Sequence, residues 1–231
     1  MNTQINITEN GTTTLATAGK YCDRNIDVNV EVAVGGEDMV ADLVQGTIEG
    51  EFVSDKVTRL KYAAFHSCNR LTKISLPNCT EIDYRSFYNC EKVEELYLPN
   101  LTAILTDANS MFAYMSSVKE IDFPNLTTIP SFGLDGTFSN CPKLTKINLP
   151  NLSATSIKRF CFANCYALHT LVLGGELKSL ENANAFNNTG NTAEKPFYIY
   201  VPDDLVDAYK TATNWVAMAD KIKPISELPE E

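Results

Sequence analysis

The sequence predicts a solenoid of short stacked coils, and two observations carry this prediction. A phrase of the form Phe-x-x-Cys-x-x-Leu-x-x-Ile-x-Leu-Pro-Asn runs from Phe65 to Asn78 and then returns down the chain. Successive Cys positions of the phrase, or their substitutes, lie 22, 25, 26, 24 and 24 residues apart. Self-similarity at such a period is typical of solenoids, in which each repeat contacts only its neighbours. Solenoids commonly serve as extended binding surfaces, so binding is the function class to test first.

Each repeat is expected to hold two short parallel strands. Residues 71–76 alternate as a strand, the Pro-Asn corner at 77–78 ends it, and 80–82 form the second strand. A brief helical turn around Phe87 is expected to lead into the next coil. Stacking at about 4.8 Å would bury the apolar columns between coils. The first-strand core positions are Leu71/Ile74/Leu76, Val93/Leu96/Leu98, Val118/Ile121/Phe123, Leu144/Ile147/Leu149 and Leu168/Leu171/Leu173.

Two further columns recur once in each repeat. The first is Phe65, Phe87, Phe112, Phe138, Phe162 and Phe186, and the second is Cys68, Cys90, Met115, Cys141, Cys165 and Thr189. Because Met and Thr can replace Cys, the second column favours reduced thiols that fill space in the core. A disulfide ladder or a metal site remains an alternative, since stacking brings the column sulfurs close together. Cys161 and Cys165 lack the partners of a zinc site.

The chain is expected to have three parts. Residues 1–36 form a small β module, with a hairpin signal at Asn10-Gly11 and strict alternation over 26–34. Residues 37–195 form the solenoid and its lead-in segment, and residues 196–231 form a closing strand and a helical cap. Open solenoid ends expose core and strand edges, so a cap is physically required.

The expected cap has two helix starts. Asp203 is the expected N-cap of a first helix, and Asn214 is the expected N-cap of a second helix that carries Trp215. Both residue types accept hydrogen bonds from the free N–H groups of a first turn.

Net charge and composition restrict the classes of molecule that this protein is expected to bind. The 231 residues carry a net charge of −10, which argues against nucleic acid and anionic membranes as partners, because both require a Lys/Arg surplus. Residues 1–7 have neither a basic start nor an apolar run, and no stretch approaches the roughly 20 apolar residues of a membrane span. A cytoplasmic or virion-associated location is therefore expected over secretion.

Catalytic templates are not matched, so no enzyme activity and no cofactor are expected. The two histidines, His66 and His169, lie within repeats and not in a motif. Gly174-Gly175 stands where other repeats have Pro-Asn, which makes it a corner variant. Asp203-Asp204 sits at a helix start, where the helix dipole favours negative charge. The Asn-x-Thr/Ser series at Asn78, Asn100, Asn125 and Asn151 is a by-product of the corners.

The repeat resembles the BspA-like leucine-rich repeat family of bacteria, whose units carry the phrase Ala-Phe-x-x-Cys-x-x-Leu-x-x-Ile-x-Leu-Pro. The resemblance spans residues 45–195. The ending at 199–222 resembles the tail that closes such proteins in gut Firmicutes and their phages, and the opening at 9–24 resembles a short module of phage and prophage proteins. The resemblance implies a right-handed curved solenoid and adhesion or protein binding at cell surfaces.

The outward positions of the first strands form the candidate binding face. They are Lys73, Glu95, Tyr97, Glu120, Asp122, Lys146, Asn148, Thr170 and Val172. In leucine-rich repeat proteins this sheet face often docks ligands; the alternative is an ordinary solvated face. Because its middle is acidic, a basic or polar protein segment is the expected guest at Glu95, Glu120 and Asp122.

Three functions follow from these observations. The leading prediction is non-catalytic protein–protein interaction or adhesion, as a recognition module at a phage or host surface. A structural role is the first alternative, in which residues 1–36 drive self-association in a virion or surface assembly. Carbohydrate binding, which needs aromatic platforms such as Tyr97, is the second alternative.

Overall fold

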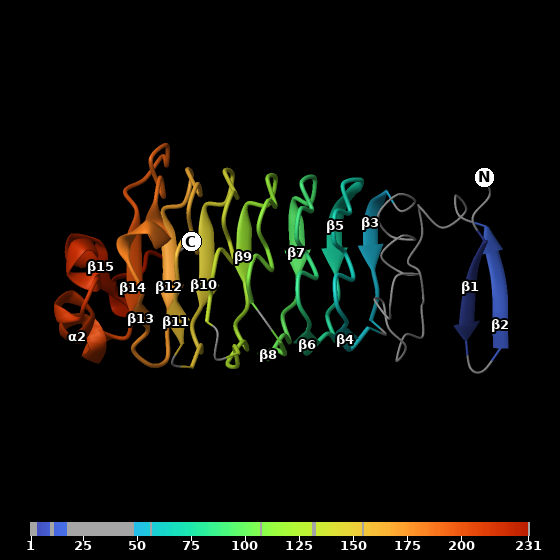
Figure 1. Ribbon diagram of the computed structural model, residues 1–231, viewed down its shortest axis with the longest axis horizontal. Helices are drawn as coiled ribbons and strands as arrows, with labels where there is room; N and C mark the ends of the chain where they lie inside the picture. The colour runs from blue at the N-terminus through green and yellow to red at the C-terminus, as the bar shows by residue number, and fades with distance from the viewer. Residues whose placement is uncertain are drawn as a thin grey trace.

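The computed structural model shows coils stacked side by side, with their first strands running in the same direction (Figure 1). It describes the backbone of residues 4–9 and 12–17, and residues 49–230 apart from 56, 107, 131–132 and 154. The first strands are β3 (Gly50–Val53), β5 (Leu71–Ser75), β7 (Glu95–Tyr97), β9 (Glu120–Asp122), β10 (Lys146–Leu149), β12 (Thr170–Leu173) and β14 (Tyr198–Val201). The second strands are β4 (Arg59–Leu60), β6 (Glu81–Ile82), β8 (Ala103–Ile104), β11 (Ser156–Ile157) and β13 (Ser179–Leu180).

Both sets of strands pair in parallel, as the repeat predicts. Ile74 lies opposite Leu96, and Ile147 lies opposite Leu171, so each core column of the sequence becomes a row across the sheet. The second strands form the ladders β4-β6-β8 and β11-β13. The stacked-coil architecture is confirmed, while its right-handed sense stays a prediction.

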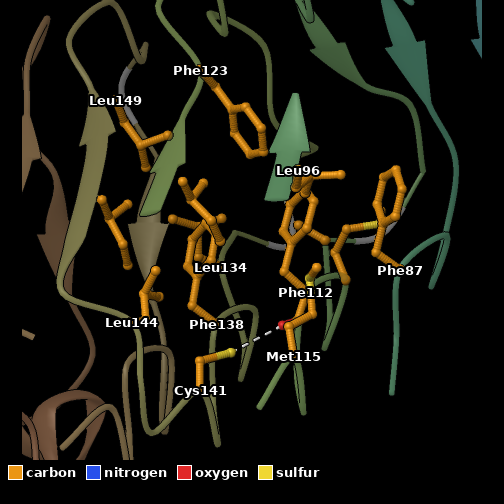
Figure 2. Packing of buried hydrophobic residues seen from close by; sticks show 14 of the residues in the cluster. Phe87, Leu96, Phe112, Met115, Phe123, Leu134, Phe138, Cys141, Leu144 and Leu149 are labelled. Atoms are coloured by element: carbon orange, nitrogen blue, oxygen red, sulfur yellow. Dashed lines mark hydrogen bonds between the residues drawn. The ribbon is translucent and has the colours of Figure 1, made fainter. Parts of the chain in front are cut away.

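The Phe column is a continuous stack of rings through the core. From Phe65 to Phe186, consecutive ring centroids lie 5.3 to 5.7 Å apart and the rings are within 17° of parallel. Figure 2 shows the middle of this stack at Phe87, Phe112 and Phe138. The equal spacing means that every coil contributes one ring in register, and this confirms the predicted column.

The turn that carries each Phe differs from the prediction. Around Phe87 the chain forms successive turns and no helix. Arg85 and Asn89 flank it with φ values of 53° and 61°, in the left-handed region. Two such residues within five cannot belong to a right-handed helix. The predicted helical turn is therefore wrong here; a short 3-10 helix, η1 (Ala183–Phe186), occurs only at the last Phe of the described column.

The Cys column is more than space-filling, because its side chains bond to the preceding coil. The Sγ atoms of Cys90, Cys141 and Cys165 donate to the carbonyls of Phe65, Phe112 and Phe138 over 2.9, 3.3 and 3.0 Å. Thr189 Oγ1 donates over 2.8 Å to the Phe162 carbonyl in the same way, which explains why Thr substitutes for Cys. The bond from Cys141 is drawn in Figure 2.

The cysteines of the described residues are buried free thiols. Burial raises the pKa of Cys79 to about 12, and burial also raises the pKa of Cys141 and Cys161 well above the ordinary thiol value. These three thiols therefore stay protonated at neutral pH, and the thiol of Cys141 can serve as the hydrogen-bond donor described above.

The Pro-Asn corners form a second ladder along the outside of the coil. Asn78, Asn100, Asn125 and Asn151 each donate their side-chain N–H to a corner carbonyl of the preceding coil, on Asp55, Pro77, Pro99 and Pro124 respectively, over 2.6 to 2.8 Å. The amide thus satisfies a carbonyl that the preceding strand leaves free when its Pro ends the ladder.

This ladder predicts an asymmetry between two substitutions at one position. Asn100→Ala removes a single exposed hydrogen bond and should lower the free energy of unfolding by about 1 kcal/mol. Asn100→Asp places an acceptor against the Pro77 carbonyl. At neutral pH it should lower the free energy of unfolding by about 1 kcal/mol more than Asn100→Ala does. Urea unfolding at pH 7 measures both. Equal stability of the two variants would contradict the donor role of the amide.

The C-terminal segment contains η2 (Asp203–Leu205), α2 (Val206–Thr211), η3 (Trp215–Lys221), β15 (Ile222–Pro224) and η4 (Ile225–Glu227). β15 adds one more parallel strand beside β14. Trp215 is buried, its ring centroid lies 5.9 Å from that of Phe186, and its Nε1 donates to the Lys178 carbonyl. The segment therefore packs on the last coil and continues both its sheet and its aromatic stack.

Asp203 is not the N-cap of η2, whose N-cap is Pro202, so that prediction is wrong. Asn214 stands at the N-cap position of η3 as predicted, but its side chain makes no cap hydrogen bond. Asp203 accepts from the backbone N–H of Ser226 at 3.1 Å instead of capping its own helix. Asn214, at φ 66°, donates over 2.8 and 2.7 Å to the carbonyls of Leu180 and Glu181. The last strand of the second ladder has no following coil to supply donors, and Asn214 supplies them from the C-terminal segment.

The hairpin signal near the N-terminus is matched by the antiparallel pair β1 (Gln4–Glu9) and β2 (Thr12–Thr17), with Glu9 opposite Thr12. The alternation at 26–34 lies outside the described residues. The expected division into three parts stays a prediction.

Candidate functional site: an acidic cleft in the sheet face

The outward positions of the first strands form one face, as predicted, with one exception. Glu95, Tyr97, Glu120 and Asp122 are exposed, and Lys73, Lys146, Asn148 and Thr170 are partly exposed. Val172 is only 2% exposed, so its predicted place on the surface is wrong. Its register neighbours are Asn148 on β10 and Tyr200 on β14, and Tyr200 is also buried.

At two strand pairs of this face, β5/β7 and β9/β10, side chains of opposite charge or polar neutral side chains lie across from acidic ones. Lys73 Nζ lies 2.9 Å from Glu95 Oε2, and this hydrogen bond raises the pKa of Lys73. On the other side, Lys146 lies opposite Glu120 in register, and Asn148 Nδ2 donates to Asp122 Oδ1 at 2.8 Å. Such cross-strand pairs stabilise a sheet.

The strands β7 and β9 are neighbours that do not pair. Within the described residues, β7 ends the sheet β3-β5-β7, and β9 begins the sheet β9-β10-β12-β14-β15. Between the two lies an open cleft of about 420 Å³. Leu96 in this cleft is 8% exposed, whereas Ile74 and Ile121 on the flanking coils are fully buried. The cleft is lined by Glu94, Glu95, Leu96, Tyr97, Pro99, Lys119, Glu120 and Asp122.

Repulsion between like charges explains why β7 and β9 do not pair. Glu95 and Glu120 occupy the same position of successive repeats, so continuous pairing would place two carboxylates directly opposite each other. Like charges in opposed positions destabilise a strand pair. The lining carries four carboxylates, those of Glu94, Glu95, Glu120 and Asp122, and one cationic side chain, that of Lys119. The cleft therefore has an excess of negative charge.

The sequence placed Glu95, Glu120 and Asp122 on one face but did not single out the cleft. The structure adds Glu94 and Lys119, which the alternation left out because they precede the strands by one residue. The repetition of Glu at one column of adjacent repeats was the available signal.

The two histidines lie outside the cleft. His66 Nδ1 lies 3.0 Å from Ser67 Oγ, and His169 Nδ1 lies 2.9 Å from Thr170 Oγ1. Among the described residues, no group of three or more His, Cys, Asp or Glu side chains is placed to hold a metal ion.

Parallel two-strand coils with a Phe stack, Cys and Asn ladders define a leucine-rich repeat solenoid. The family description "BspA type Leucine rich repeat region" matches the chain in six copies, over residues 47–137 and 110–199. The chain belongs to this family of BspA-type leucine-rich repeat proteins, as the sequence resemblance implied. Such repeats generally mediate protein–protein interaction or adhesion, and the fold is typically non-catalytic.

The solved structures similar to this chain include the leucine-rich repeat protein of T. pallidum (TpLRR). It is 20% identical, with a TM-score of 0.39, and the match covers 75% of this chain and 85% of that chain. Among curated proteins, no sequence matches this chain. In the described part of the chain, no helix has the length and apolar character needed to cross a bilayer.

Proposed function

We propose that this protein binds a basic segment of a partner protein in the acidic cleft between β7 and β9. The observation that carries the proposal is the cleft itself, in which four carboxylates stand with one lysine and the strand ladder is interrupted. Two of these carboxylates, on Glu95 and Asp122, contact side chains of the strands outside the cleft. A Lys or Arg side chain from a partner would offset the remaining excess of negative charge.

The aromatic side of the cleft supports the same guest. Tyr97 is 54% exposed at the end of β7 and lines the cleft beside Asp122. A cation held between a carboxylate and a tyrosine ring gains both Coulombic and cation–π attraction. Exposed tyrosines also contribute disproportionately to protein interfaces. The expected partner segment therefore carries two or more basic residues in extended conformation.

The test uses a fluorescein-labelled decapeptide of alternating Lys and Thr, titrated with the full chain by fluorescence anisotropy. The double variant Glu94→Lys/Glu120→Lys should weaken binding at least about tenfold, because two of the cleft carboxylates reverse sign. Raising the salt from about 50 to about 300 mM should weaken binding to the wild type, since exposed charges are screened. A peptide of alternating Glu and Thr should not bind.

The matched control is a charge change of the same size away from the cleft. Glu194→Lys/Glu230→Lys alters two exposed residues that lie outside the cleft lining. It should leave the affinity within about twofold of wild type. If the control weakened binding as much as the cleft double variant, net charge alone would explain the effect and the proposed site would be wrong.

The other roles predicted from the sequence require separate experiments. Self-association through residues 1–36, as in a virion or surface assembly, predicts a larger mass by light scattering for the full chain than for a chain lacking that segment; equal monomer masses contradict it. Carbohydrate binding predicts glycan-array signals that Tyr97→Ala removes. The virion-associated or cytoplasmic location stays a prediction.

A further inference from the structure

A second surface gathers aromatic side chains on the turn edge of the first coils. Tyr62 and Tyr84 occupy equivalent positions three residues before the core Phe, and their ring centroids lie 5.5 Å apart. Tyr88 stacks on His66 at 5.1 Å and meets Tyr114 edge-on at 5.5 Å. Three successive coils thus contribute to one aromatic strip outside the core.

Arg85 joins the two halves of this strip. Its guanidinium carbon lies 4.9 Å from the ring centroid of Tyr84 and 5.3 Å from that of Tyr88. Stacking on two rings restricts the long side chain, so the entropy that a flexible arginine loses on binding is already reduced. The guanidinium is held in place before any ligand arrives.

The charge of Arg85 is not neutralised within the described chain. The other described arginines, Arg59, Arg70 and Arg159, each have a carboxylate oxygen within 4.0 Å. Arg85 has no such ion pair, and its buried Nε has no hydrogen-bond acceptor. In a chain with a net charge of −10, an arginine without a carboxylate is the exception.

The neighbouring histidine senses the same charge. Burial lowers the pKa of His66, and the positive charge of Arg85 lowers it further. A carboxylate paired with Arg85 would have cancelled much of this second effect.

We infer that Arg85, walled by Tyr84 and Tyr88, is a receptor for a side-chain carboxylate of an acidic peptide segment. A planar guanidinium accepts a carboxylate through two parallel N–H···O bonds. One guanidinium matches a singly charged carboxylate better than a phosphate dianion, which proteins usually bind with clusters of arginines. The tyrosines of the strip supply apolar contact for the rest of the peptide. This site is separate from the acidic cleft and does not depend on it.

The experiment follows the Arg85 Nε–Hε signal by NMR in the labelled full chain. The probe is an end-blocked pentapeptide of alternating Glu and Tyr, and the matched peptide has Gln for each Glu. The Glu peptide should shift the signal saturably, and the Gln peptide should bind at least about tenfold more weakly. Arg85→Gln should abolish binding, whereas Arg59→Gln, which alters a paired arginine, should not change it.

Three results would overturn the inference: no shift of the Arg85 signal, equal binding of the two peptides, or unchanged affinity of Arg85→Gln. Hexagalacturonate and inorganic phosphate are titrated in parallel. Binding of hexagalacturonate without the Glu peptide would reject a peptide as occupant in favour of an acidic glycan, and phosphate binding as tight as the Glu peptide would reject carboxylate selectivity. Because the wild-type signal is read directly, misfolding of Arg85→Gln does not remove the test.

Discussion

Replacing Phe138 by Ala is expected to lower the free energy of unfolding by about 3–5 kcal/mol. Phe138 is buried, and its ring stacks on Phe112 at 5.4 Å and on Phe162 at 5.7 Å. The residues that carry the adjoining rings are held by backbone hydrogen bonds to the following coils, from Phe112 N–H to the Thr137 carbonyl and from Phe162 N–H to the Ala185 carbonyl. The rings therefore cannot collapse into the vacated space. Urea unfolding followed by circular dichroism measures the loss.

The matched control for this prediction lies in the next coil. Phe160 is 45% exposed and precedes the core ring of its own coil by two residues. Phe160→Ala removes the same atoms without opening a cavity and should change stability by less than about 0.5 kcal/mol. Equal destabilisation by the two variants would mean that the ring stack does not hold the coils together.

Lys178→Met is expected to lower the free energy of unfolding by about 2–4 kcal/mol, because it leaves buried carbonyls without a donor. Lys178 is fully buried. Its Nζ donates to the carbonyls of Leu152 at 2.7 Å and Gly174 at 2.9 Å, and to that of Glu176. Gly175 stands at the Asn position of this corner, and a Cβ there would come within 2.3 Å of the Leu152 carbonyl oxygen. No Asn can therefore continue the corner ladder, and the lysine bonds to carbonyls of this corner instead.

The pH dependence of this lysine has a definite sign. Burial lowers the pKa of Lys178 to about 8, against an unperturbed value of 10.5, with Glu176 opposing the shift. Between these values the unfolded chain binds the proton that the folded chain releases, so the contribution of Lys178 to stability rises with pH. It is fully present above 10.5 and is lost as the pH falls through 8.

The difference in unfolding free energy between wild type and Lys178→Met should therefore grow from pH 8 to pH 10.5. Burial also raises the pKa of Tyr209 to about 12, which destabilises the fold at higher pH, but this residue is common to both proteins and cancels in the difference. Lys195→Met, at an exposed position, should show no such trend. A difference that stayed constant over this window would contradict the lowered pKa.

The apolar architecture was predictable because burial repeats with the coil. The Phe column and the first-strand rows follow from one period, and the structure places them in register. The hydrogen-bond roles were not predictable in the same way: the acceptors of Cys90 and Asn100 lie 25 and 23 residues earlier in the chain, where no local pattern points. Side-chain donors were therefore misread as filler or as purely local turn formers.

The predictions that failed for single residues have a different cause. Val172 fits the outward alternation, but whether a position is exposed at the end of a sheet depends on the strands that follow, here β14 and β15. Asp203 and Asn214 have good N-cap side chains, and Asn214 does stand at the N-cap position of η3. Their side chains nevertheless bond to other parts of the C-terminal region and of the last coil. The aromatic strip around Arg85 is built from side chains of three coils at four different offsets from the core Phe, so no single column of the repeat predicts it.

The corner Asn donors and the column donors Cys90, Cys141, Cys165 and Thr189 point back by one unit, so these junctions between units are built from interchangeable parts. A gene that lost residues 91–115 would join neighbours whose interlocking groups still match. Lys73 would then lie beside Glu120, an attractive pair in place of a repulsive one. The cleft between β7 and β9 thus depends on which two repeat units are neighbours. Recombination that changes the number of units could create or remove it without altering the rest of the scaffold.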